Sequence, residues 1–234
     1  MLFKISVFSF ILIAVCYSNL VISKEYPENE KDRGLILPKY TGEISIGPAL
    51  ISGNERRNYE ANFNFRYAIT DNFELARFGL RYLFLERENQ QWAFRFQNYG
   101  IGKSSEGDFF HHTEFGVDGK QQFSESLALL YNLGYFWSDS HEKDGKTSEY
   151  RASIGAITKL NTTSSLQVGY SRRYFSGFKA SSANVIGSKL VYNLNPSLDG
   201  IIIFRISDFN EAVDSILFNE SYDKMLSIGV NWRF

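Results

Sequence analysis

After residue 23, apolar residues recur at every second position, and no other feature of this chain constrains its fold as strongly. The clearest case is the C-terminal segment, where one set of alternate positions is wholly apolar: Leu226, Ile228, Val230, Trp232 and Phe234. Successive side chains of a β-strand point to opposite faces, so this segment predicts a strand with one apolar face. Such a strand either separates lipid from water or belongs to a half-buried soluble sheet.

The same alternation predicts eleven strands: residues 40–52, 57–69, 73–86, 91–101, 109–119, 124–138, 147–159, 163–175, 182–194, 197–208 and 221–234. Bacterial single-chain barrels have an even number of strands. We favour twelve, with the missing strand within 24–39. The alternatives are ten strands, with 40–52 outside the barrel because Pro48 cannot donate to a ladder, or two predicted strands that are in fact one.

The first 23 residues differ from the rest of the chain. One cation, Lys4, precedes an apolar run over residues 5–15, which predicts a secretory signal peptide cut near Ser23 and Lys24. The alternative is a membrane anchor, but the apolar run is shorter than the roughly 18–20 residues that a spanning helix needs. The chain's one cysteine, Cys16, lies here, and the preceding Val15 does not suit a lipoprotein signal.

Composition excludes several classes of protein. Aromatic residues make up 16% of the 234 residues, too many for a disordered chain, and one cysteine excludes a disulfide scaffold. A net charge of -1 gives no reason to expect a nucleic-acid partner. Without the predicted signal peptide no long apolar run remains, so the rest of the chain could span a membrane only as a closed barrel.

The expected fold is therefore all-β, a transmembrane antiparallel up-and-down β-barrel of twelve strands, with ten as the alternative. We expect three parts: a signal peptide at 1–23, a charged periplasmic N-terminal segment at 24–39 and the barrel at 40–234. The N-terminal segment is interpreted as a tail or a plug of the lumen. A disordered leader is the alternative.

The aromatic Phe234 after an alternating strand resembles the last strand of bacterial outer-membrane β-barrel proteins. The resemblance implies that the barrel-assembly machinery reads the apolar face from Leu226 to Phe234, and that the protein contacts outer-membrane lipid and lipopolysaccharide. In length and compactness the chain is also similar to small monomeric oligogalacturonate-type porins, which implies a monomer in the bacterial outer membrane.

The sequence contains little that suggests catalytic chemistry. The three histidines, His111, His112 and His141, do not match the histidine–serine signatures of outer-membrane hydrolases. His112 and Glu114 share a strand face, but two ligands are too few for a metal site. No cofactor-binding motif is present. We therefore expect no catalytic residues, no metal, no cofactor and no enzymatic activity.

Strand parity predicts a basic lumen. The cations on the predicted inner face are Arg66, Arg77, Arg81, Arg95, Arg151, Lys189, Arg205 and Arg233, and the acids are Glu43, Glu60, Glu114 and Asp118. A basic lumen with low-dielectric walls concentrates anions. The sequence thus predicts a narrow passive channel for small solutes, with a preference for anions.

The residues predicted to line the pore are Arg66, Arg81, Arg95, Arg151 and Arg205. Two other functions stay open. The first is a structural or surface-interaction barrel, in which paired charges brace a closed lumen and loops 139–146 and 208–221 contact a partner. The second, less favoured, is an outer-membrane enzyme.

Overall fold

A computed structural model describes residues 27, 29–53, 56–76, 78–101, 110–140, 147–176, 181–208 and 224–234. The predicted signal peptide, Arg77, His141 and most of the two predicted contact loops lie outside these residues, as do the side chains of Glu60 and His111.

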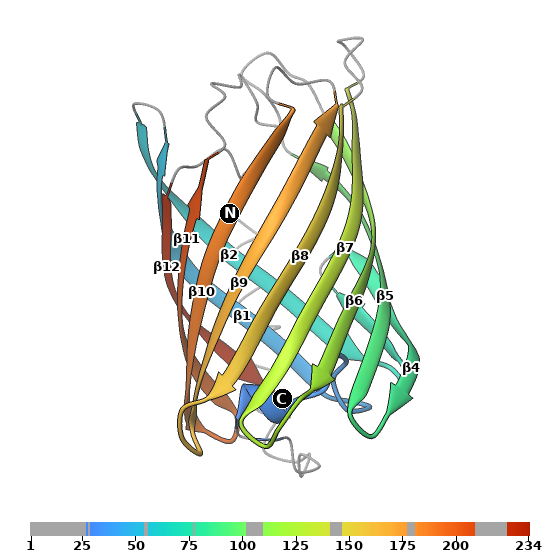
Figure 1. Ribbon diagram of the computed structural model, residues 1–234, viewed down its shortest axis with the longest axis vertical. Helices are drawn as coiled ribbons and strands as arrows, with labels where there is room; N and C mark the ends of the chain where they lie inside the picture. Colours follow the sequence, from blue (N-terminus) through green and yellow to red (C-terminus); the bar gives the residue numbers. More distant parts are fainter. Residues whose placement is uncertain are drawn as a thin grey trace, which may run out of the picture.

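The described chain forms a closed antiparallel barrel of twelve strands, which confirms the expected fold class (Figure 1). The strands are β1 (Gly42–Gly53), β2 (Arg56–Ala68), β3 (Phe73–Ala76), β4 (Gly79–Arg87), β5 (Gln90–Ile101), β6 (Phe110–Gln122), β7 (Leu127–Ser140), β8 (Thr147–Lys159), β9 (Ser164–Ser176), β10 (Ser182–Asn195), β11 (Leu198–Ser207) and β12 (Lys224–Arg233). Each strand pairs with its neighbours in the chain, and β1 pairs with β12 to close the barrel.

The twelfth strand is not where we expected it. The predicted strand at 73–86 is two strands, β3 and β4, paired so that Ala76 faces Gly79. Phe78 has a positive φ of 65°, a conformation typical of a tight reversal. The described part of 24–39 contains a short 3-10 helix, η1 (Glu30–Asp32), and no strand. Placing the missing strand in 24–39 was therefore wrong.

The barrel has two different ends. At one, the turn end, the strands are joined by residues 69–72, 88–89, 123–126, 160–163 and 196–197, and this end also holds the C-terminus (Figure 1). Asn161 shows how such a turn closes, since its Oδ1 accepts hydrogen bonds from the backbone N–H of Thr163 (2.9 Å) and of Ser164 (2.7 Å). The opposite end is called the loop end below.

The apolar face of each strand points outward. On β12, Leu226, Ile228 and Val230 are 42%, 56% and 41% exposed, whereas the alternate residues Ser227 and Asn231 are buried against the lumen. The same outward exposure of large apolar side chains recurs around the barrel, as at Phe63, Leu133, Ile154, Ile186 and Phe204. The exterior is thus apolar and the interior polar, as in a barrel surrounded by lipid. None of the described residues forms a helix with the length and hydropathy of a membrane span.

Where β1 and β12 meet to close the barrel, their backbones lie unusually near each other at two places. A Cβ atom at Gly47 would lie 2.3 Å from the Ile228 carbonyl oxygen and 2.5 Å from Gly229 Cα. Gly42 and Phe234 exchange two backbone hydrogen bonds, of 2.7 and 3.0 Å. Pro48 lies within β1, opposite Ala61 of β2, and its carbonyl accepts a hydrogen bond from the Ser227 hydroxyl (3.0 Å).

Gly47→Ala should weaken this closure, because the new methyl group would collide with backbone atoms that cannot rotate away. We expect a loss of about 1–3 kcal/mol in the free energy of unfolding, the usual range for overpacking. Urea unfolding of refolded protein, followed by heat-modifiable gel mobility, measures it. Gly169→Ala is the matched control, because the nearest atom to its Cβ is 3.5 Å away; an equal loss in both variants would contradict the prediction.

Candidate functional site

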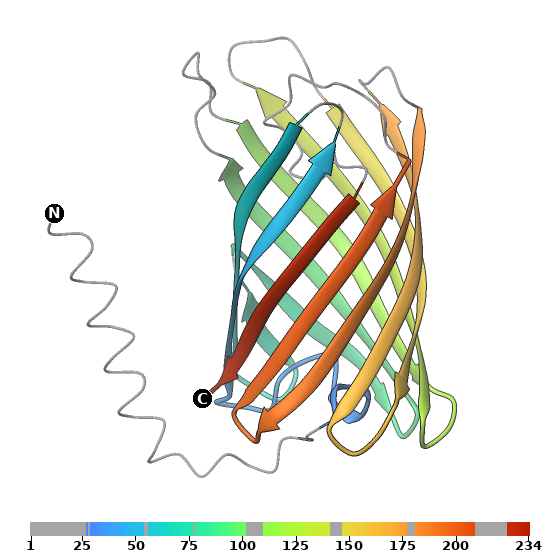
Figure 2. The same cartoon turned by 90° about the vertical axis from the view of Figure 1, so that its left-hand side faces the viewer.

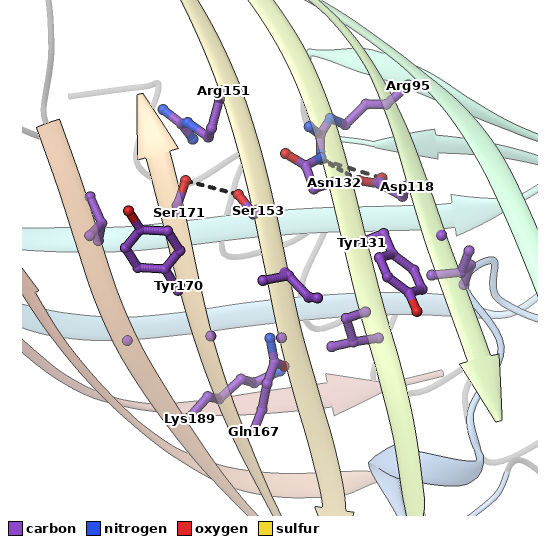
Figure 3. A pocket seen from close by; sticks show the side chains of 18 of the residues that line it. Arg95, Asp118, Tyr131, Asn132, Arg151, Ser153, Gln167, Tyr170, Ser171 and Lys189 are labelled. Carbon is purple, nitrogen blue, oxygen red and sulfur yellow. Dashed lines mark hydrogen bonds and ion pairs between the residues drawn. The ribbon is translucent and has the colours of Figure 1, made fainter. Parts of the chain in front are cut away.

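The barrel encloses a cavity of about 640 Å³ (Figure 3). All five arginines predicted to line the pore also line this cavity: Arg66, Arg81, Arg95, Arg151 and Arg205. Arg173, Lys189, Glu114 and Asp118 line it as well. The positions of the five arginines match strand parity, while their contact with a passing solute stays a prediction.

Glu74 on β3 holds two of these arginines. Arg66 donates to both Glu74 carboxylate oxygens, from Nε at 2.7 Å and from Nη2 at 2.8 Å, and Arg81 approaches the same carboxylate at 3.4 Å. Glu43 adds a second, longer contact to Arg66 at 3.5 Å. Because Glu74 is fully buried, its charge depends on these partners for compensation.

Asp118 on β6 continues the network across the barrel wall. It accepts from Arg81 Nη2 at 3.0 Å, from Arg95 Nη1 at 3.1 Å and from Asn132 Nδ2 at 2.7 Å, and Figure 3 shows the last two contacts. Arg95 also pairs with Glu114. Arg81 therefore joins the Glu74 and Asp118 groups into one chain of alternating charges.

A second buried carboxylate, Glu149 on β8, organises the next part of the wall. Arg173 contacts both its oxygens at 2.7 Å, and Arg151 donates from Nε at 2.9 Å. The Arg151 guanidinium also lies 4.5 Å from the centre of the Phe136 ring, a cation–π contact. These contacts hold Arg151 in one orientation at the cavity wall.

The N-terminal plug, defined as residues 29–37, lies inside the turn end of the barrel (Figure 2). The Asn29 side chain donates to the carbonyl oxygens of Asn161 (2.9 Å) and Ser164 (3.0 Å). At the other end of the plug, the Leu37 N–H donates to Glu74 Oε2 at 3.0 Å. Between them Ile36 packs against Leu83 and Ala93.

Two charged residues of the wall hold the middle of the plug. Lys120 on β6 donates to the carbonyl oxygens of Lys31 and Arg33. The Arg33 guanidinium makes two bonds to Asp199 on β11, at 2.6 and 2.9 Å, and Arg233 on β12 pairs with the same fully buried carboxylate. The plug is thus bound to strands from both halves of the barrel.

Leu35 connects the plug to the arginines of the cavity. Its carbonyl oxygen accepts from Arg66 Nη2 and from Arg81 Nη1, both at 2.9 Å. It also lines both the main cavity and a second cavity of about 290 Å³, which extends beside the plug. The plug therefore narrows the lumen at the turn end.

Asp32, at the end of η1, carries a pH-dependent contact. Burial by itself raises the pKa of Asp32, but hydrogen bonds and charges of Lys31 (3.1 Å) and Lys159 (3.2 Å) outweigh it and hold this pKa below its ordinary value. A lowered carboxyl pKa stabilises the folded state above the unfolded-state value, and that stabilisation is lost as the pH falls through the folded-state value. Acid therefore weakens this contact between the plug and β8.

Several charged residues of the lumen were not among those predicted from the sequence. Glu149, Arg173, Asp199 and Lys120 all have inward parity, so the alternation itself could have identified them. Glu74 could not be found in that way, because the reversal between Ala76 and Gly79 changes which positions point inward. Three of these residues, Glu74, Glu149 and Asp199, are carboxylates that are fully buried in the wall. The net charge of the lumen is therefore closer to neutral than the predicted set of eight cations and four acids implies.

His112 and Glu114, which share a face of β6, are both buried. The His112 ring lies 5.5 Å from that of Phe136. Within the described ranges, no three His, Cys, Asp or Glu side chains come together as a metal-binding group.

Comparison with known proteins supports the architecture. No family model matches the chain, and no curated protein matches it in sequence. A solved structure of the NanC porin is similar, with a TM-score of 0.56 and 11% identity, over 81% of this chain and 98% of that one. The fold resembles that of outer-membrane porins. The KdgM porin also matches, with a TM-score of 0.47 and 11% identity over 82% of this chain and 99% of that one. OmpT of Vibrio cholerae matches with a TM-score of 0.49 and 8% identity over 83% of this chain and 96% of that one.

Asp199→Asn should loosen the plug, because it leaves the Arg33 and Arg233 guanidinium groups buried without their carboxylate. Breaking a buried ion pair costs about 3–5 kcal/mol. Trypsin digestion in detergent should then cut after Lys31 or Arg33 at least tenfold faster than in the unmodified protein, as mass spectrometry can show. The control is Asp71→Asn, at an exposed residue, which should leave the cleavage rate unchanged. Equal cleavage of the Asp199 variant and the unmodified protein would contradict this role.

Proposed function

We propose that the protein is a narrow passive channel of the bacterial outer membrane for small solutes, with a preference for anions. The observation that carries this proposal is the cavity inside a closed barrel, lined by more cations than acids. Low-dielectric walls strengthen the field of such a lumen and concentrate anions in it. The similarity to porins supports the fold that this function requires.

The orientation and partners follow from the same proposal. In outer-membrane barrels the short turns face the periplasm and the longer loops face outward, so we place the turn end and the plug in the periplasm. The outward apolar face contacts outer-membrane lipid and, on the outer side, lipopolysaccharide. The strand face from Leu226 to Phe234 serves the barrel-assembly machinery, and the protein acts as a monomer.

A closed structural or surface-interaction barrel is the second candidate. It is favoured by the ion pairs of Glu74, Asp118 and Glu149, which compensate much of the lumen charge, and by the plug at the turn end. The two functions differ in whether the plug leaves an ion path. An enzymatic function has no support from the described side chains.

Lys120→Met tests the contribution of the plug to conductance. The substitution removes the ammonium group that binds two plug carbonyls but keeps a side chain of similar length. In planar bilayers we expect the refolded protein to conduct and the variant to show at least twice the mean conductance, because the plug is less firmly held. Lys39→Met, at an exposed turn residue, is the control. If neither the protein nor the plug variant conducts, the lumen is closed and the second candidate is correct.

Arg205→Gln tests the anion preference. The residue lines the cavity, so its loss should shift the reversal potential in a KCl gradient toward cations while the single-channel conductance stays within about twofold. Arg172→Gln is a matched control: Arg172 follows the outward parity of β9 and lies against Tyr174, with 5.4 Å between its guanidinium carbon and the ring centre. The same shift in both variants would argue against a selective role for the lumen arginines.

A further inference from the structure

The inward-facing lysines of the barrel have partners of a different kind from those of its arginines. Several strand arginines are held by carboxylates of the wall, as Arg173 is held by Glu149. The three inward lysines of the described strands instead contact the plug: Lys120 donates to its carbonyl oxygens, Lys159 pairs with Asp32, and Lys189 pairs with Glu30. An ammonium group is a point charge on a flexible stem, whereas a guanidinium binds a carboxylate as a rigid fork. The lysine contacts of the plug are therefore easier to exchange than the pairs that brace the wall.

The pair of Lys189 and Glu30 lies where the two cavities meet. Lys189 lines both cavities and is next to Gln167 of β9 on the wall (Figure 3), and Glu30 lines the second cavity. The two side chains of the pair are 29% and 19% exposed, whereas the carboxylates of Glu149 and Asp199 are fully buried. A solute in the lumen can therefore reach this ion pair.

Glu30 is only partly satisfied by this contact. Its Oε1 accepts from the Lys189 ammonium group, but its Oε2 is buried and has no hydrogen-bond donor among the described residues. A buried acceptor without a donor loses the hydrogen bonds that water would give it. The wall at Lys189 thus binds a carboxylate, and the carboxylate that the plug supplies fits there imperfectly.

The second cavity places an apolar surface beside this cation. Its volume is about 290 Å³, at the lower end of the roughly 300–1,000 Å³ typical of small-molecule sites. Its aliphatic wall consists of five side chains, from the plug, β7, β8, β10 and β11: Leu35, Leu130, Ile157, Val191 and Ile201. The other cations that line the cavity are bound to carboxylates or to plug carbonyls: Arg33, Arg66, Arg81 and Lys120. One exchangeable cation beside an aliphatic wall suits a small molecule with one negative charge and a short hydrocarbon tail.

We propose that the second cavity binds small aliphatic carboxylates, and that Glu30 is an internal ligand that competes with them for Lys189. The carboxylate of the solute replaces that of Glu30 on the ammonium group, so the charge at Lys189 stays balanced. The hydrocarbon tail of the solute lies against the aliphatic wall. Because Glu30 belongs to η1, its release loosens η1, while Arg33 stays bound to Asp199.

Butyrate binding tests the competition. The Kd of butyrate for the refolded full chain in deuterated detergent is measured by saturation-transfer NMR, with protein-free micelles as the blank. Glu30→Gln should lower this Kd at least threefold, because the internal competitor loses its charge. Lys189→Met should raise the Kd at least tenfold, because the cation is removed while a side chain of similar length remains. Heat-modifiable mobility confirms that each variant is folded.

Glu88→Gln, in the exposed turn between β4 and β5, is the matched control for Glu30→Gln and should leave the Kd unchanged. An equal Kd in the unmodified protein and in Glu30→Gln would overturn the competition. An equal Kd in the unmodified protein and in Lys189→Met would overturn the assignment of the site.

The ligand class has its own test in the same measurement. Butyramide has the shape of butyrate without the charge, and acetate has the charge without the longer tail. Butyrate should bind at least threefold more tightly than either compound. Equal binding of butyramide would overturn the role of the cation, and equal binding of acetate would overturn that of the aliphatic wall.

Trypsin cleavage after Lys31 measures the release of η1. Replacing chloride by butyrate at constant ionic strength should speed this cleavage at least twofold in the unmodified protein and leave it unchanged in Lys189→Met. Equal rates in the two salts for the unmodified protein would overturn the coupling of binding to the plug. These measurements need no current through the barrel, so their failure is distinguishable from failure of the channel function.

Discussion

Every part of this structure depends on completing the backbone hydrogen bonds around a closed ring of strands. In an apolar environment an unpaired N–H or C=O group costs several kcal/mol, so a sheet can persist there only if its first and last strands meet. In this chain the meeting of β1 and β12 uses the Gly47–Gly229 approach and the paired ends Gly42 and Phe234. The closed ring then forces one side chain in two into the lumen.

Closure of the barrel places charged side chains inside the lumen, and each buried charge there needs a partner of opposite sign. Glu74, Glu149 and Asp199 are fully buried, and each lies against two arginines. Single removal of such a partner leaves a buried charge without compensation, which is far more costly than the pair is beneficial. The same pairs leave a modest excess of cations along the cavity, so a rigid wall and an attractive field for anions come from one set of residues.

Alternation alone was sufficient to predict the barrel, its outward faces and five arginines of the cavity, because each depends only on whether a position is odd or even within a strand. Alternation failed at residues 73–86, where the chain reverses at Phe78. The positive φ of Phe78 cannot be read from the hydropathy pattern. The pairing of Arg33 with Asp199 was equally out of reach, since 166 positions separate the two residues and the plug has no periodicity of its own. Long-range partners require the register of the strands, which the pattern of a single strand does not contain.

The contacts that hold the plug, residues 29–37, join the beginning of the described chain to its end. The residues that hold the plug belong to β6, to the turn before β9 and the start of β9, and to β11. The Asp199 carboxylate, which binds Arg33, also binds Arg233, the last residue of β12. The earliest part of the described chain therefore completes its contacts only when β11 is in place, and the carboxylate that it shares with Arg233 links it to β12. The contacts of residues 29–37 therefore couple the stability of the N-terminal segment to that of the C-terminal strands, although the two are far apart in the chain.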